Sequence, residues 1–180
     1  MLARKTVDLA FAKLTAMTTR RQHLSTLGGL FGALVGIPGL MGATTAHAAR
    51  VYEVLLSEAE WKKRLDPEQY AVLRRSGTER PYTSPLNKEK RAGIFRCAGC
   101  ARPLFSSEAK FESGTGWPSF WQPLAATSVY EDSDTSFGTR RTEVVCQGCG
   151  GHLGHVFDDG PKPTGLRYCM NGVAMKFVPA

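Results

Sequence analysis

The sequence of 180 residues lacks the patterns that mark fibrous or disordered proteins. It contains no helix-period heptads, no Gly-X-Y repeat, no internal repeat and no long low-complexity run. Coiled coil, collagen and extended disorder are therefore excluded as its main architecture. Its length and its 42% of hydrophobic residues are typical of one modest globular domain with an appendage.

Charged side chains are absent from residues 22–49, a stretch of 28 positions near the N-terminus. The core of this stretch, residues 24–41, is apolar, but glycines and Pro38 dilute its hydrophobicity and weaken helix formation. A permanent membrane span needs about 20 strongly apolar residues. The composition therefore argues against a permanent span.

The residues that flank this stretch have the pattern of a cleavable export signal. Arg20 and Arg21 precede it, and Ala46 and Ala48 supply the small-x-small pattern that a signal peptidase reads. Paired arginines before a glycine-rich core resemble a twin-arginine signal, which implies a periplasmic location. An uncleaved amphiphilic anchor is the alternative interpretation.

Cleavage after Ala48 would divide the chain into an export signal, residues 1–48, and a domain, residues 49–180. The signal holds five of the 23 Lys and Arg residues and one of the 16 acidic residues, so the formal net charge falls from +7 to +3. The remaining basic residues are scattered in pairs and form no stripe that follows a phosphate backbone. We expect no nucleic-acid partner.

The domain is predicted to begin with two short helices and to continue as strands. Ser57 begins a capping box for a helix that ends at Leu65, and Asp66 caps a second helix that Gly77 ends. Runs that favour β structure follow, separated by Gly, Pro, Ser and Asp. They cover residues 93–97, 128–131, 143–146, 155–158, 166–170 and 173–178. The pattern predicts a mainly β fold, a small antiparallel domain with short N-terminal helices.

Four of the five cysteines form two Cys-x-x-Cys pairs, Cys97 with Cys100 and Cys146 with Cys149. Two such turns supply the four thiolates of a closed tetrahedral zinc site. A site of this kind is structural, because it keeps no open position for a substrate. The gap between the pairs is longer than in zinc ribbons, so we expect them at the ends of separate hairpins.

Other interpretations of these cysteines stay open. Export would allow the pairs to oxidise to disulfides, one pair could be redox-active, and iron is the main alternative metal. His152 and His155 also stand at metal-like spacing from the second pair and could replace two sulfurs. No βαβ pattern surrounds either pair, which argues against a thioredoxin-like redox motif.

The fifth cysteine, Cys169, is a candidate nucleophile. Arg167 and Asn171 lie two residues away on either side, so on a strand they share its face and can stabilise a thiolate. Lowering a thiol pKa from about 8.5 to near 7 requires only about 2 kcal/mol of differential interaction. The alternative is that Cys169 is a small buried hydrophobic residue.

Two further segments have unusual compositions. The predicted mature domain has only two histidines, His152 and His155, so imidazole-based proton transfer depends on them. Their odd spacing directs them to opposite faces of a strand unless Gly154 bends the chain, and the alternative is that both bond only backbone groups. Residues 114–121, with three aromatic rings, two glycines and a proline, predict a rigid loop that presents an aromatic pocket or covers the core.

Segments GIFRCAGCARPLF, KFESGTGWPSF, VVCQGCGGHLGHVFDDGP and PTGLRYCMNGVAMKF follow the order and spacing of the methionine sulfoxide reductase B family. The resemblance covers residues 57–177. It implies a small zinc-bound domain of two packed antiparallel β-sheets. It also implies reduction of methionine-R-sulfoxide, free or in proteins, to methionine.

The resemblance implies a role for each candidate residue. Cys169 would attack the sulfoxide sulfur and become a sulfenic acid, while His155 would protonate the oxygen. His152 and Asn171 would assist this proton transfer. Substrate binding would involve Trp117, which lines a pocket for the substrate methyl group, together with Arg167 and Asp159.

Two positions depart from the family pattern. Many members carry a resolving cysteine where this chain has Thr115, and the other four cysteines are committed to metal. We therefore expect an external thiol or a thioredoxin-like protein to reduce the sulfenic acid on Cys169. Gly172 stands where a serine commonly follows the asparagine, a change that can loosen Asn171.

These observations predict a monomeric, exported enzyme that repairs oxidised proteins in the cell envelope. A non-catalytic, zinc-stabilised module that binds another protein is the alternative, because fold alone does not fix function. That alternative accounts for the four paired cysteines and leaves Cys169, His155 and Trp117 unexplained.

Overall fold

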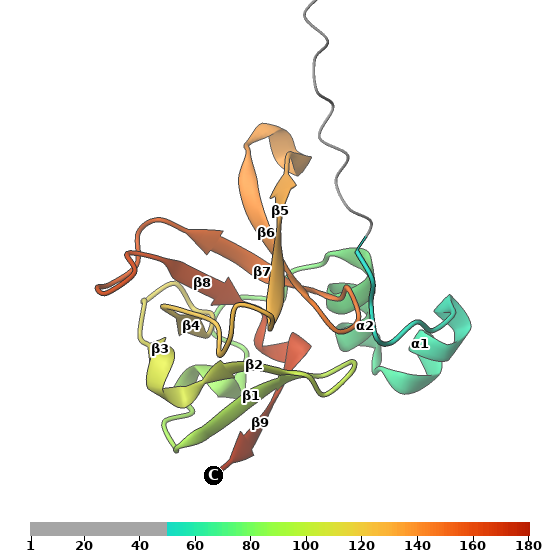
Figure 1. The fold of residues 1–180 in the computed structure, drawn as a ribbon, viewed down its shortest axis with the longest axis horizontal. Helices are drawn as coiled ribbons and strands as arrows, with labels where there is room; N and C mark the ends of the chain where they lie inside the picture. Colours follow the sequence, from blue (N-terminus) through green and yellow to red (C-terminus); the bar gives the residue numbers. More distant parts are fainter. Residues whose placement is uncertain (1–49) are drawn as a thin grey trace, which may run out of the picture. The chain divides into compact units, whose positions relative to one another are not determined.

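A computed structural model describes residues 50–180, which form short helices followed by β-strands (Figure 1). The predicted export signal, residues 1–48, lies outside the described residues. Within residues 50–180, no helix is long and apolar enough to cross a membrane. The helices and strands are α1 (Glu58–Arg64), α2 (Pro67–Arg75), β1 (Gly93–Cys97), β2 (Pro103–Ser106), β3 (Lys110–Phe111), β4 (Ser119–Phe120), β5 (Val129–Asp134), β6 (Arg141–Cys146), β7 (His152–Phe157), β8 (Arg167–Met170) and β9 (Met175–Pro179).

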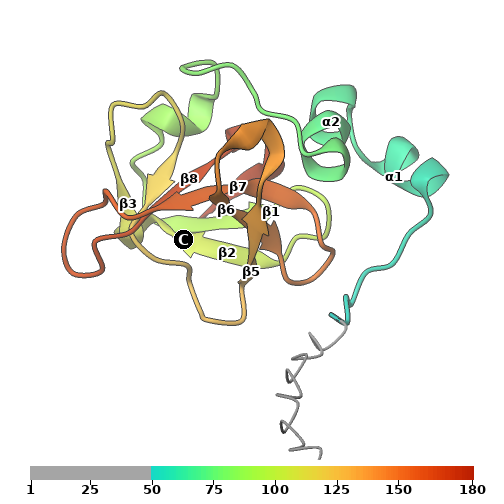
Figure 2. The same ribbon diagram turned by 90° about the horizontal axis from the view of Figure 1, so that it is seen from above.

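The strands form two antiparallel sheets, seen from two directions in Figures 1 and 2. The smaller sheet has the order β2-β1-β9, and the larger sheet has the order β3-β4-β8-β7-β6-β5. Each hydrogen-bonded pair of neighbouring strands is antiparallel. The prediction of a mainly β, two-sheet antiparallel fold is confirmed.

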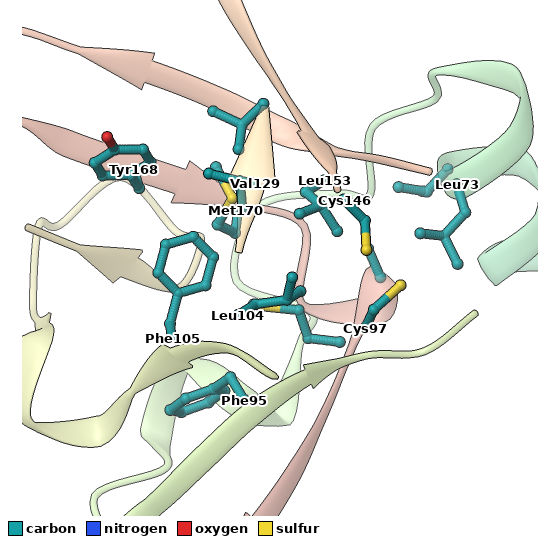
Figure 3. Packing of buried hydrophobic residues seen from close by; sticks show 14 of the residues in the cluster. Leu73, Phe95, Cys97, Leu104, Phe105, Val129, Cys146, Leu153, Tyr168 and Met170 are labelled. Carbon is teal, nitrogen blue, oxygen red and sulfur yellow. The ribbon is translucent and has the colours of Figure 1, made fainter. Parts of the chain in front are cut away.

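Apolar side chains from both sheets form the core (Figure 3). Phe95 of β1, Phe105 of β2 and Phe120 of β4 are completely buried. The Phe120 ring stacks on Phe105 at a centroid distance of 4.4 Å and meets Phe95 edge-on at 4.9 Å. Aromatic pairs of this geometry add about 1 kcal/mol to the hydrophobic gain of burial. These three rings therefore join the smaller sheet to the larger one.

Both helices begin at the predicted capping residues. Ser57 caps α1 in a reciprocal capping box, and Asp66 caps α2 in the same way. The prediction that α2 ends at Gly77 holds to within two residues, because the helix ends at Arg75 and the left-handed residue after it is Ser76, with φ of 50°. Gly77 is instead needed for close approach, because a Cβ there would lie 2.8 Å from the carbonyl oxygen of Ala71.

Candidate active site and metal centre

The four paired cysteines come together as a compact cluster of sulfur atoms. Their Sγ atoms all lie within 4.8 Å of one another, with 3.7 Å between Cys97 and Cys149 and 3.5 Å between Cys100 and Cys146. Tetrahedral zinc with Zn–S bonds of about 2.3 Å separates its sulfurs by about 3.8 Å. The donor set and its spacing therefore fit a four-sulfur metal site, as predicted.

This cluster joins two hairpins that belong to different sheets. Cys97 and Cys100 lie at the turn between β1 and β2, and Cys146 and Cys149 at the turn between β6 and β7. The prediction of separate hairpins is confirmed. A Cβ at Gly148 would lie 3.1 Å from the Cys100 sulfur, so glycine leaves room for the ligand. A bound metal would link the two sheets.

The histidines do not join the sulfur cluster in the described residues, so the mixed cysteine-histidine site is not formed. Antiparallel pairing of β7 with β8 places His155 directly opposite Cys169. A register shift between β6 and β7 turns His152 toward the same region, and the two imidazole rings lie 5.5 Å apart. The bend occurs around Gly154, where a Cβ would lie 2.1 Å from the Cys169 carbonyl oxygen.

Each histidine pairs with a carboxylate, so the interpretation that both bond only backbone groups was wrong. Nε2 of His155 lies 2.8 Å from Oδ2 of Asp134, and Nδ1 of His152 lies 2.5 Å from Oε1 of Glu143. Burial lowers the pKa of His155, and its hydrogen bond to Asp134 opposes that effect. Hydrogen bonds from Ser136 and His155 hold the pKa of Asp134 well below its usual range.

Cys169 is partly exposed in the middle of the larger sheet, so it is not the sealed hydrophobic residue of the alternative interpretation. Burial raises the pKa of the Cys169 thiol above its usual value, and the Thr115 hydroxyl and the Arg167 guanidinium offset this rise only in part. Arg167 is fixed by two hydrogen bonds to Asp159, of 2.8 and 2.7 Å. Its guanidinium also lies 4.4 Å from the centre of the Phe157 ring. The predicted cation is therefore held beside the sulfur.

The Asn171 side chain bonds backbone groups next to this site. Its Nδ2 donates to the Leu153 carbonyl at 3.1 Å, and its Oδ1 accepts from the Glu79 amide at 2.9 Å. The carboxylate of Glu79 in turn accepts the amides of Gly172 and Val173, at 2.6 and 2.9 Å. Asn171 is therefore fixed from both sides.

Gly172 does not leave Asn171 loose, contrary to the expectation from sequence. Its amide is bonded to Glu79, and a Cβ at this position would lie 1.9 Å from Ser84 Oγ. The buried Ser84 side chain occupies the space that a larger residue at position 172 would need. The neighbour of Asn171 is consequently well packed.

The aromatic residues of the 114–121 segment have different positions. Phe120 belongs to the core, as the core-covering interpretation predicts. Trp117 is half-buried on the loop before β4, and its indole Nε1 donates to the Glu79 carbonyl at 3.2 Å. Thr115, on the same loop, lies 3.8 Å from the Cys169 sulfur, measured from its Oγ1. The loop that carries Trp117 thus borders Cys169.

His152, His155 and Asn171 were identified from the sequence, and the acidic residues that form hydrogen bonds with them were missed. Asp134 and Glu143 contact the histidines only because β5, β6 and β7 pair as neighbours. Glu79 lies 92 residues from Asn171 in sequence, and nothing in its local pattern indicates this contact. The carboxylates that contact His152 and His155 are thus those of Glu143 and Asp134, and not that of Asp158, which is nearer to both histidines in sequence.

Comparison with known proteins agrees with this geometry. A family model described as the SelR domain matches residues 65–179. The chain is 55% identical over 126 residues to peptide methionine sulfoxide reductase MsrB of Leptospira interrogans, covering 70% of this chain and 96% of the relative. It is 54% identical to the MsrB of Agrobacterium fabrum, covering 68% and 91%, and 58% identical to that of Pseudomonas putida, covering 67% and 90%. The chain belongs to the SelR, or methionine sulfoxide reductase B, family.

Proposed function

We propose that this protein reduces the R epimer of methionine sulfoxide, free or within proteins, with Cys169 as nucleophile. The observation that carries the proposal is the β7–β8 register, which sets His155 opposite Cys169. Relatives that are 54% to 58% identical to this chain over the aligned residues are named peptide methionine sulfoxide reductases. Trp117 lies on the loop that borders Cys169, and in this proposal it receives the substrate methyl group.

The reaction is an attack of the Cys169 thiolate on the sulfoxide sulfur. A sulfoxide oxygen leaves poorly until it is protonated, so the thiolate needs a proton donor close by. His155 supplies that proton, and its bond to Asp134 through Nε2 leaves Nδ1 for the transfer. The attack forms a bond between the two sulfurs, and the protonated oxygen leaves as hydroxide. Hydroxide then attacks the Cys169 sulfur and breaks that bond, so that Cys169 becomes a sulfenic acid and methionine leaves, its sulfur having gained two electrons.

Reduction of the sulfenic acid then depends on a thiol from outside the chain. The other four cysteines gather around the metal site, and the position next to Cys169 is Thr115. An external thiol, or a thioredoxin-like protein, attacks the sulfenic sulfur to give a mixed disulfide and water. A second thiol releases Cys169 and completes the cycle.

The metal contributes to the structure and takes no part in these steps. Cys97, Cys100, Cys146 and Cys149 would hold zinc with four thiolates, and this closed site supplies only a link between the hairpins. Removal of the metal would act on activity through the fold alone.

We also propose that the protein is monomeric and is exported to the periplasm, where it repairs oxidised envelope proteins. The support for export is the paired Arg20 and Arg21 before an uncharged, glycine-rich stretch. Cell fractionation of the full-length protein should find it in the periplasm, and replacing both arginines by lysine should keep it in the cytoplasm. Retention of the unaltered protein in the cytoplasm would refute export.

A stereospecific assay tests the proposed activity. The purified protein, with dithiothreitol as reductant, should reduce the R epimer of methionine sulfoxide and leave the S epimer unchanged. A folded Cys169→Ser variant should lose the activity. If the unaltered protein reduces neither epimer, the alternative of a non-catalytic binding module gains support.

A further inference from the structure

Three hydroxyl groups form a continuous chain from the Cys169 sulfur into the interior of the protein. Thr115 Oγ1 lies 3.8 Å from the Cys169 sulfur, and Ser113 Oγ lies 2.8 Å from Thr115 Oγ1. Ser119 Oγ follows at 2.7 Å from Ser113 Oγ and can donate to the Trp117 carbonyl at 3.3 Å. Each distance is within hydrogen-bonding range, with the longer limit that sulfur allows.

The fold fixes the two ends of this chain. Ser119 is completely buried in β4, where it pairs directly with Cys169 of β8. The far end is therefore closed to water, while Thr115 and Cys169 are partly exposed. A buried hydroxyl without a partner would cost about 1 to 3 kcal/mol, so Ser119 needs Ser113 or the Trp117 carbonyl as a partner.

The hydrogen bonds of this chain can all form with either of two opposite donor–acceptor orders. With a neutral thiol, Cys169 donates to Thr115, Thr115 donates to Ser113, Ser113 donates to Ser119, and Ser119 donates to the Trp117 carbonyl. With a thiolate, the order reverses, and Ser119, Ser113 and Thr115 each donate toward the sulfur. A hydroxyl group both donates and accepts, so rotation about the C–O bonds satisfies either state. Hydrogen bonds in such a chain also polarise one another.

We propose that Ser119, Ser113 and Thr115 form a hydroxyl relay that reverses direction when Cys169 ionises and thereby stabilises the thiolate. These three are positioning residues, since they act on the substrate only through the sulfur. The inference rests on the proposed function, in which Cys169 is the nucleophile. Burial raises the pKa of the Cys169 thiol, and a hydrogen-bond donor next to the sulfur counteracts this rise by stabilising the thiolate.

Alkylation of Cys169 measures the relay without the sulfoxide reaction. The rate of modification by iodoacetamide, followed by mass spectrometry on the metal-loaded protein from pH 5 to 10, reports the pKa of this thiol. Thr115→Val keeps the shape and removes the hydroxyl, and it should raise the pKa by about one unit, which slows alkylation at pH 7 about tenfold. Thr115→Ser keeps the hydroxyl and should retain the original pKa. An unchanged pKa in Thr115→Val overturns the relay.

A double-mutant cycle separates a relay from independent contacts. Ser113→Ala should also raise the pKa of Cys169, but it should add nothing in the Thr115→Val background, because the connection to the sulfur is already lost. Equal effects of Ser113→Ala in both backgrounds would refute the relay. Metal content and circular dichroism check that each variant is folded, and Ser113→Ala supplies the test if Thr115→Val is not.

Failure of the proposed function has a different signature. If Cys169→Ser retained sulfoxide reduction, Cys169 would not be the nucleophile, whatever its alkylation profile. If Cys169→Ser were inactive and Thr115→Val kept the original thiol pKa, the nucleophile would stand and only the relay would fail.

Discussion

The domain contains cysteine side chains in two different environments, the four-sulfur cluster and the site around Cys169. At the metal centre, four sulfurs lie at hairpin turns and face one another within 4.8 Å. Cys169 lies instead in the middle of a sheet, with Arg167 and Thr115 beside the sulfur and His155 opposite. We expect the groups around each thiol to set its reactivity, because the thiolates of the metal centre would all be occupied as metal ligands, whereas Cys169 would not.

The largest expected effect comes from Cys169→Ser. Reduction of R-methionine sulfoxide with dithiothreitol should fall at least about a thousandfold, as when other covalent nucleophiles are removed. Metal content and thermal unfolding should stay close to those of the unaltered protein, because Cys169 lies outside the sulfur cluster. Loss of bound metal in this variant would break the distinction between the two environments.

Cys146→Ser tests the same comparison from the other side. Cys146 is completely buried in the cluster, so its loss should release the metal and lower the thermal midpoint by more than about 10 °C. Metal analysis and circular dichroism provide the measurement, with Cys169→Ser as the matched control. A variant that kept its metal and melted normally would show that this sulfur is not a ligand.

Asp134→Asn should change the pH dependence of catalysis. Asp134 opposes the effect of burial on His155, whereas the charges of Arg141 and His152 lower the pKa of His155. Removing the carboxylate should therefore lower that pKa, by about one unit. An acid must be protonated to act, so the fall in kcat with rising pH should begin about one unit lower.

The matched control for this variant is Asp132→Asn, which removes the same charge from the same strand. Asp132 forms an ion pair with Arg50 and not with His155, so its pH profile should match that of the unaltered protein. An equal shift of the pH profile in both variants would mean that the general loss of a negative charge, and not the contact with His155, sets the pKa of the proposed proton donor.

Gly172→Ser is expected to act on stability, and it tests the packing next to Asn171. The added side chain has to displace Ser84 and should lower the free energy of unfolding by about 1 to 3 kcal/mol in urea titrations. Adding Ser84→Gly to this variant should recover much of the loss. Equal stability of Gly172→Ser and the unaltered protein would mean that position 172 has room to spare.

Elements with strong local signals could be predicted from the sequence. The capping residues Ser57 and Asp66 placed both helices, and the run from Gly93 to Cys97 is strand β1. Strands β2, β3 and β4 were missed: β2 has four residues and begins with Pro103, and β3 and β4 have two residues each. Propensity over so short a stretch carries no usable signal.

The candidate site divides in the same way. Cys169 and Arg167 could be placed together because they are two residues apart on one strand and therefore share a face. Both histidines were recognised from their motif. The partners of these residues come from strands that are distant in sequence. Which carboxylate meets which histidine depends on the register shift between β6 and β7, and the sequence does not specify that shift locally.

The missing side chain at Gly154 has a consequence for the evolution of this site. Even one methyl group there would lie 2.1 Å from the backbone oxygen of Cys169 and would force β7 and β8 apart. The separation of His155 and Cys169, the proposed proton donor and nucleophile, thus depends on the absence of a side chain at Gly154. We expect a substitution at Gly154 to move His155 away from Cys169 and to lower the proposed activity, although both side chains are still present.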